Sequence, residues 1–188
     1  MAHWYHYYRQ NKLLIGLVVA AIIAGTVVTH YWRQSVAIGD YDPASDKACI
    51  VNLFKQDLYW LSSNPHYSPD FMLDTRSPNK QLIYRGKMAI KVLRHCGACA
   101  GFVTYYIPSP GHGILLFLGV DPAFRGRGYG KKLVQHAIDD LVRQGAHTIN
   151  LTTRTTNFPA QKIYETVGFK EIVRDEEGLL YYVYTAQK

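Results

Sequence analysis

The longest apolar stretch of the chain covers residues 13–29, which carry no charged side chain, and aromatic residues extend it to 13–32. About 20 apolar residues suffice for a helix to cross a bilayer. Aromatic clusters lie at both ends of the stretch, and Arg9, Lys12 and Arg33 bracket it, as is typical of membrane interfaces. The pattern predicts a transmembrane helix. A cleaved signal peptide and a buried helix of a soluble domain are the alternatives, and the first is disfavoured by the length of the run and the lack of a cleavage site.

A second pattern joins a strand to a helix. Residues 114–120 contain no polar side chain, which predicts a strand buried on both faces. Pro122 ends this strand because proline has no N–H for the next ladder hydrogen bond. From Gly130 onward apolar residues recur at helical spacing, namely Leu133, Val134, Ala137, Ile138, Leu141 and Val142. The chain therefore reads as strand, loop and helix between residues 114 and 142.

Weaker patterns predict the other elements. A helix is expected over residues 43–62, capped by Asp42 or Ser45, after a linker at 34–44. Residues 63–80 contain three prolines and are expected to form an irregular loop. The remaining expected elements are strands at 88–94, 100–107, 148–153, 169–173 and 179–184, turns at 96–97 and 108–113, and a helix at 160–167 with Pro159 in its first turn.

The loop between strand and helix has the composition of an anion site. Gly126, Gly128 and Gly130 let an anion approach the backbone, and the N-terminus of the following helix attracts negative charge. The loop is not a P-loop, because Arg125 replaces its first glycine and Lys132 its Ser or Thr. It is not the dinucleotide fingerprint either, because the third glycine comes one residue early. The pattern present is R-x-x-G-x-G.

This pattern after a buried strand resembles the acyl-CoA pyrophosphate loop of the GNAT superfamily of N-acetyltransferases. A second signature of that family, N-x-x-A-x-x-x-Y-E-x-x-G-F, follows at the right distance and is made by Asn157, Ala160, Tyr164, Glu165, Gly168 and Phe169. The resemblance covers about residues 88–170. It implies a mixed α/β (α+β) fold whose mostly antiparallel central sheet is flanked by helices, here preceded by one transmembrane helix.

The resemblance also implies the site. Acetyl-CoA is the expected co-substrate, its pantetheine arm lying between the splayed fourth and fifth strands, and no metal is expected. The cofactor-binding residues it implies are Leu118, Gly119, Val120, Arg125, Gly126, Arg127, Gly128, Tyr129, Gly130, Lys131 and Asn157. Tyr164 matches the family's catalytic acid, and its ordinary pKa of about 10 keeps a phenol protonated at neutral pH. Asn157 is expected near the start of its helix, where its side chain can also serve as a cap.

No general base is assigned from the sequence. Some members of the family carry a glutamate five residues before the motif asparagine, where this chain has Thr152. Asp121, His112 and Glu171 are candidates by proximity alone. The missing carboxylate leaves an alternative open, in which a GNAT-like module binds acyl-CoA as a sensor without turnover.

Charge and cysteine content narrow the other possibilities. The formal net charge of +7 suits a polyanionic ligand such as CoA, and scattered aromatic and basic residues form no recognisable nucleic-acid-binding module. Three cysteines are an odd number and too few for a disulfide scaffold, which favours a reducing compartment. The pair Cys96 and Cys99 is expected to be structurally incidental, because no second pair of metal ligands follows.

These observations predict an anchor at residues 1–33 and an acyltransferase domain at 34–188. The expected reaction is direct attack of a primary amine, on a small molecule or a protein, on acetyl-CoA in a ternary complex. The charges around the apolar stretch weakly favour an N-terminus inside the cell and hence a domain outside it. The difference amounts to about one charge, which is a weak signal of topology. Acetyl-CoA is not expected outside the cytoplasm, so the catalytic domain is expected inside it.

Overall fold

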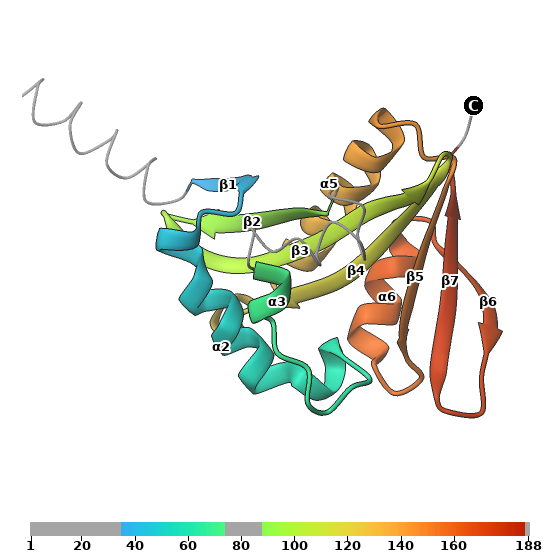
Figure 1. Ribbon diagram of the computed structural model, residues 1–188, viewed down its shortest axis with the longest axis horizontal. Helices are drawn as coiled ribbons and strands as arrows, with labels where there is room; N and C mark the ends of the chain where they lie inside the picture. The colour runs from blue at the N-terminus through green and yellow to red at the C-terminus, as the bar shows by residue number, and fades with distance from the viewer. Residues whose placement is uncertain (1–34, 74–87, 187–188) are drawn as a thin grey trace, which may run out of the picture. The chain divides into compact units, whose positions relative to one another are not determined.

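The structure is a computed structural model that describes residues 35–73 and 88–186 of the chain (Figure 1). The predicted anchor at 1–33 thus lies outside the described residues. Within them, no helix has the length and apolarity that crossing a bilayer requires. Contacts divide the chain into two units. The larger unit, Ala37–Arg94 with Ala98–Lys188, contains all the described helices and strands except the first residue of the first strand and the last residue of the second. The described residues of the smaller unit are 35, 36 and 95–97.

The described residues build a sheet of seven strands in the order β1-β2-β3-β4-β5-β7-β6. The strands are β1 (Val36–Asp40), β2 (Ala89–His95), β3 (Ala98–Ser109), β4 (His112–Val120), β5 (Thr148–Arg154), β6 (Lys170–Arg174) and β7 (Leu179–Thr185). Strands β4 and β5 are parallel, whereas β3–β4, β5–β7 and β6–β7 are antiparallel pairs. The predicted mixed, mostly antiparallel sheet is confirmed.

Helices lie on both faces of this sheet (Figure 1). They are α2 (Pro43–Leu61), α3 (Asp70–Leu73), α5 (Tyr129–Arg143) and α6 (Phe158–Thr166), with the short 3-10 helix η1 (Pro122–Phe124) after β4. Helices α2 and α3 pack on one face, where Phe54 of α2 contacts the rings of Phe102 and Phe117. Helix α5 packs on the other face, where Tyr105 donates a hydrogen bond of 2.6 Å to Asp140. The predicted helices at 43–62, from 130 and at 160–167 are confirmed.

Three predicted boundaries are wrong. The linker at 34–44 contains β1, a short strand whose place is fixed by its partner β2 through Tyr41, which donates its N–H to the carbonyl of Ile90 at 3.0 Å. The loop at 63–80 contains the one-turn helix α3, held by the core contacts of Met72. The turn at 108–113 is shorter than expected because β3 and β4 extend to Ser109 and His112. Each difference comes from a tertiary contact that outweighs local propensity.

A β-bulge in β4 changes which side chains face each helix layer. Thr104 of β3 pairs with Phe117, whereas the next residue, Tyr105, pairs with Leu115, so that Leu116 is the extra residue of β4. A bulge bends its strand and reverses the alternation of faces beyond it. Gly113 and Phe117 are four residues apart and would face the same side of a regular strand. Instead Gly113 lies against Leu141 of α5, whereas Phe117 packs with α2 on the other face. The expectation of a strand uniformly buried on both faces misses this change.

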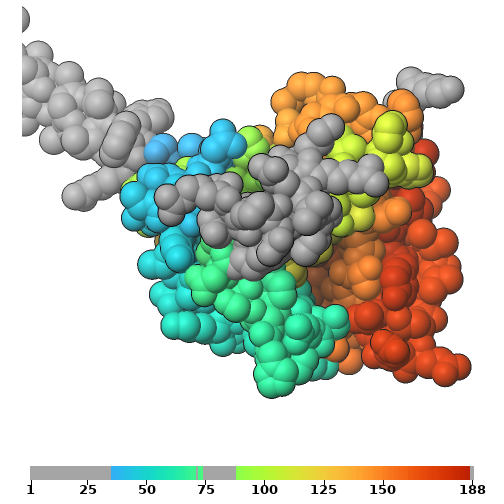
Figure 2. Space-filling view, in the orientation of Figure 1, coloured from blue at the N-terminus to red at the C-terminus, as the bar shows by residue number. Residues whose placement is uncertain are grey.

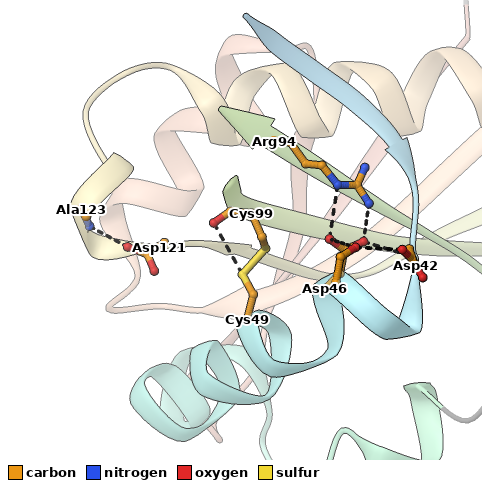
Figure 3. The surroundings of a disulfide bond; sticks show 8 residues. Asp42, Asp46, Cys49, Arg94, Cys99, Asp121 and Ala123 are labelled. Atoms are coloured by element: carbon orange, nitrogen blue, oxygen red, sulfur yellow. Dashed lines mark hydrogen bonds and ion pairs between the residues drawn. A yellow bond between two sulfur atoms is a disulfide. The ribbon is translucent and has the colours of Figure 1, made fainter. Parts of the chain in front are cut away.

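Helix α2 is fastened to the sheet by a disulfide and a buried ion pair (Figure 3). Cys49 of α2 is bonded to Cys99 at the start of β3, whereas Cys96 is free. One turn earlier, the buried carboxylate of Asp46 is ion-paired with Arg94 of β2. The expectation that the Cys96 and Cys99 pair is incidental is wrong for Cys99. The Cα atoms of Cys49 and Cys99 lie 6.3 Å apart, within the range that a disulfide can bridge, because α2 packs on β3. The number and spacing of cysteines in the sequence do not reveal this proximity.

The disulfide closes a separation of 50 residues, for which loss of chain entropy in the unfolded state predicts a stabilisation of about 4 kcal/mol. We expect the double variant Cys49→Ala, Cys99→Ala of the full chain, kept in mild detergent, to lose most of this in urea unfolding. Cys96→Ala is the matched control and should change the free energy of unfolding by less than about 1 kcal/mol. Equal urea midpoints for oxidised and reduced wild type contradict the prediction.

Candidate functional site

The two parallel strands at the centre of the sheet part from each other. Their pairing consists of His112 with Thr148, Gly113 with Ile149 and Ile114 with Asn150. The bulge at Leu116 follows at once, and a cleft of about 720 Å³ lies beyond it, a volume typical of ligand sites. Residues 116–120 of β4 line one wall, and Thr152 and Thr153 of β5 belong to the other. The cleft therefore results from the bend in β4.

The loop after β4 carries the glycines to one end of the cleft. Asp121 caps η1 by accepting a hydrogen bond of 2.9 Å from the N–H of Ala123. Gly126 and Gly128 then adopt φ angles of 76° and 77°, a left-handed conformation that side chains rarely tolerate. Gly128 is the N-cap of α5, whose first intrahelical bond joins the N–H of Lys132 to the carbonyl of Gly128 at 3.1 Å. The first turn of α5 therefore directs N–H groups and positive dipole toward an anion.

Two cations lie in the wall at this end, Arg125 and Lys131. The Nε of Arg125 donates to the carbonyl of Val120 at 3.0 Å, and its guanidinium is ion-paired with Asp57 of α2. Arg127 does not line the cleft, and its guanidinium carbon lies 5.7 Å from the centroid of the Phe124 ring. The electrostatics of the loop thus rest on two side chains and the helix terminus.

A buried phenol lies in the wall formed by α6. Tyr164 is only 6% exposed and packs against the rings of Phe169 and Tyr182, with centroid distances of 6.0 Å to each. Burial, with a smaller contribution from Tyr182, raises the pKa of Tyr164 above its ordinary value. The phenol is therefore protonated at neutral pH and can act as a proton donor.

Helix α2, which packs on the face of the sheet opposite to α5, forms another wall of the cleft. Its geometry becomes non-helical at Asp57, with φ −118° and ψ 20°, and the last turn carries Trp60 into the lining of the cleft. Arg154 at the end of β5 holds this turn, because its guanidinium donates to the carbonyls of Tyr59 at 2.5 Å and Ser62 at 3.3 Å. Figure 2 shows the surfaces of the α2–α3 segment and the β5–α6 segment adjoining here. The last turn of α2 is thus part of the site.

Comparison with known proteins agrees with this arrangement. The family model described as Acetyltransferase (GNAT) family matches residues 52–169, more than half of the chain. The chain belongs to this family. The match extends from α2 to the start of the last hairpin and so includes both walls of the cleft, the glycine loop and Tyr164.

Individual relatives resemble this GNAT-family chain either over a short part of its sequence or over most of its fold at low sequence identity. It is 47% identical over 58 residues to a "[Ribosomal protein bS18]-alanine N-acetyltransferase" of Haemophilus ducreyi, which is 31% of this chain and 40% of that protein. The chain therefore matches about two fifths of that relative. The structures of yncA from Salmonella typhimurium with its cofactor acetyl-CoA and of the ribosomal-protein-S18-alanine N-acetyltransferase from Escherichia coli share the fold. Their TM-scores are 0.67 and 0.61 at 18% and 19% identity, covering 81% and 80% of this chain and 94% of each of theirs.

The GNAT site brings together most residues that the sequence suggested. Those that line the cleft are Leu118, Gly119, Val120, Arg125, Gly126, Gly128, Tyr129, Gly130, Lys131, Asn157 and Tyr164. Arg127 is outside the lining. Asn157 is the N-cap residue of α6, but the expectation of a side-chain cap is wrong, because its side chain makes no capping hydrogen bond.

The three carboxylate and imidazole candidates for a base do not line the GNAT cleft. Asp121 caps η1, His112 is hydrogen-bonded to Thr148 at 2.8 Å, and Glu171 is paired with Arg174. Thr152 does line the cleft. Among the described lining residues, Asp57 is the single acidic one, and sequence reasoning missed it together with Trp60. No motif marks either residue, since only the folding of α2 over the sheet brings them to the site.

Proposed function

We propose that the chain is an acetyl-CoA-dependent N-acetyltransferase that transfers an acetyl group to a primary amine of a small molecule or a protein. The observation that carries the proposal is the parting of β4 from β5 beside a glycine loop at a helix N-terminus. This gives an extended ligand a cleft between two strands and an anion site at its end. Membership of the GNAT family and the likeness to yncA with acetyl-CoA support the choice of donor.

The donor-binding residues are assigned by position. The backbone of Leu118, Gly119 and Val120 offers hydrogen-bonding groups to a pantetheine arm lying in the cleft. Backbone N–H groups from residue 125 to 131 bind the pyrophosphate, and Arg125 and Lys131 supply positive charge. Asn157, beside the arm in the wall, is a further polar contact.

The donor supplies a thioester, whose carbonyl carbon the neutral acceptor nitrogen attacks directly. The C–N bond forms first and gives a tetrahedral oxyanion, and the collapse of this oxyanion breaks the C–S bond and releases the thiolate. We assign stabilisation of the oxyanion to a backbone N–H at Leu118 or Val120. Tyr164 gives its proton to the departing thiolate sulfur, and burial keeps the phenol protonated until then. The amine proton leaves through water, since Thr152 cannot accept it as a carboxylate would.

The acceptor enters on the side of α2, where Trp60 and Leu61 line the cleft. The relative from Haemophilus ducreyi is named for an alanine of ribosomal protein bS18. For this chain a primary amine on a protein or a small molecule is proposed, because the aligned part of that relative is too short to carry its acceptor over.

Calorimetric titration of acetyl-CoA into the full chain in mild detergent tests the donor site. We expect saturable binding that is lost in the variant Arg125→Ala, Gly128→Glu, because the variant removes a cation and places a carboxylate where phosphate binds. Thiol release from the same samples with a panel of primary amines then measures turnover. Absence of binding to folded wild type contradicts the proposal, and binding without thiol release favours the sensor alternative.

Substitution of the proposed acid tests the chemical step. Tyr164→Phe keeps the ring packed against Phe169 and Tyr182, so acetyl-CoA affinity should stay near that of wild type. Loss of the proton donor should lower kcat by about 100-fold or more. Because the pKa of the phenol is raised, wild-type kcat should show no loss of this acid between pH 7 and about 10. An equal loss of affinity and kcat in the variant identifies Tyr164 as a packing residue.

For the N-terminal part of the chain we propose a single-pass anchor at residues 1–33 with the domain at 34–188 in the cytoplasm. The apolar stretch 13–32 and the need for acetyl-CoA support this. The disulfide between Cys49 and Cys99 points the other way, since such bonds persist mainly in oxidising compartments. We give the donor more weight because the reaction cannot proceed without it.

Protease treatment of membrane vesicles of both orientations tests the anchor and its topology. The domain should sediment with the vesicles and be digested only where the cytoplasmic face is outside. Recovery of the full chain in the soluble fraction contradicts the anchor. Digestion restricted to vesicles of the other orientation contradicts the cytoplasmic domain and agrees with the disulfide.

A further inference from the structure

The ion pair between Asp57 and Arg125 connects the side of the cleft proposed for the donor with the side proposed for the acceptor. Arg125 belongs to the glycine loop after β4, and Asp57 belongs to α2, on the side proposed for the acceptor. Both residues line the cleft, with side-chain exposures of 51% for Arg125 and 18% for Asp57. A carboxylate is therefore positioned where the anionic part of a donor is expected to bind.

The position of Asp57 is fixed from both directions along the chain. Before it, α2 is tied to β3 by the disulfide of Cys49. After it, the last turn of α2 is held by Arg154, whose guanidinium carbon also lies 4.0 Å from the centroid of the Tyr59 ring. Asp57 cannot readily follow Arg125 if the arginine moves, because its backbone is held at both ends.

Arg125 is the more exposed member of the pair. Its side chain is half exposed, and its Nε donates to the carbonyl of Val120 at the end of β4. A guanidinium has five N–H donors and binds phosphate in the same two-pronged way as it binds carboxylate. Phosphate groups seated on the first turn of α5 therefore compete with Asp57 for the same donors.

We propose that donor binding draws Arg125 from Asp57 to the phosphates, and that the released Asp57 carboxylate binds the ammonium form of the acceptor amine, which gives one proton to water before its neutral nitrogen attacks the thioester. This rests on the proposed function. A partly buried carboxylate that loses its partner cation favours another one, and Asp57 is the single acidic group among the described lining residues. Trp60, three residues further on, adds an aromatic surface suited to a cation. Asp57 is thus the residue that selects a cationic acceptor and makes its binding depend on the donor.

The first test measures CoA binding to the full chain by calorimetry in wild type, Asp57→Asn and Asp70→Asn. The Asp57→Asn variant should bind CoA about two- to fivefold more tightly, because it removes the competitor for Arg125. Asp70→Asn is the matched control, since Asp70 is an exposed carboxylate paired with Lys47 outside the cleft and loses the same charge. Weaker CoA binding in Asp57→Asn overturns the proposal, because it means that Asp57 orients Arg125 for the donor.

The second test separates KM from kcat for a cationic amine at saturating acetyl-CoA. In Asp57→Asn the acceptor KM should rise about tenfold or more, with kcat changed much less, and Asp57→Glu should recover most of the loss. An acceptor KM equal to that of Asp70→Asn overturns the proposal while leaving the proposed function intact. Wild type that neither binds CoA nor releases thiol overturns both, so the two failures are distinguishable.

Discussion

The bend in β4 is the constraint on which the site depends. Pairing with β5 ends at Ile114, and the extra residue Leu116 turns the strand so that Phe117 reaches the core under α2. A continuous parallel pair would fill this space with backbone hydrogen bonds and leave no cleft. The sheet stays intact because β4 keeps its antiparallel pairing with β3 through Val120. The absence of β4–β5 pairing beyond Ile114 thus leaves room for the cleft at the centre of the sheet.

Helix α2 connects the stability of the fold with the chemistry of the cleft. Its first half is held by the disulfide of Cys49 and the buried pair of Asp46 with Arg94, and its apolar face covers the sheet. Its last turn, beyond the change of geometry at Asp57, carries Trp60 to the cleft. Because these contacts hold α2 on the sheet, loosening them would also displace Trp60 and the side of the cleft proposed for the acceptor.

Opposite electrostatic environments meet within this one cleft. At one end, the helix terminus, Arg125 and Lys131 favour an anion. In the α6 wall, burial favours the neutral form of Tyr164 and raises its pKa. On the α2 side, Asp57 favours a cation. The cleft therefore presents an anion-favouring end, a neutral proton donor and a carboxylate, each set by a different physical effect.

By itself the sequence determined the strand, glycine loop and helix around Gly128 and the motif that contains Tyr164, because these depend on neighbours along the chain. Helical periodicity and the left-handed glycine conformation are local properties, and so most of the loop side of the site was predictable. The bulge at Leu116, the bond between Cys49 and Cys99 and the entry of Asp57 into the cleft were decided by tertiary structure alone. Each requires residues far apart in the chain to meet, and no local pattern records a distance through space.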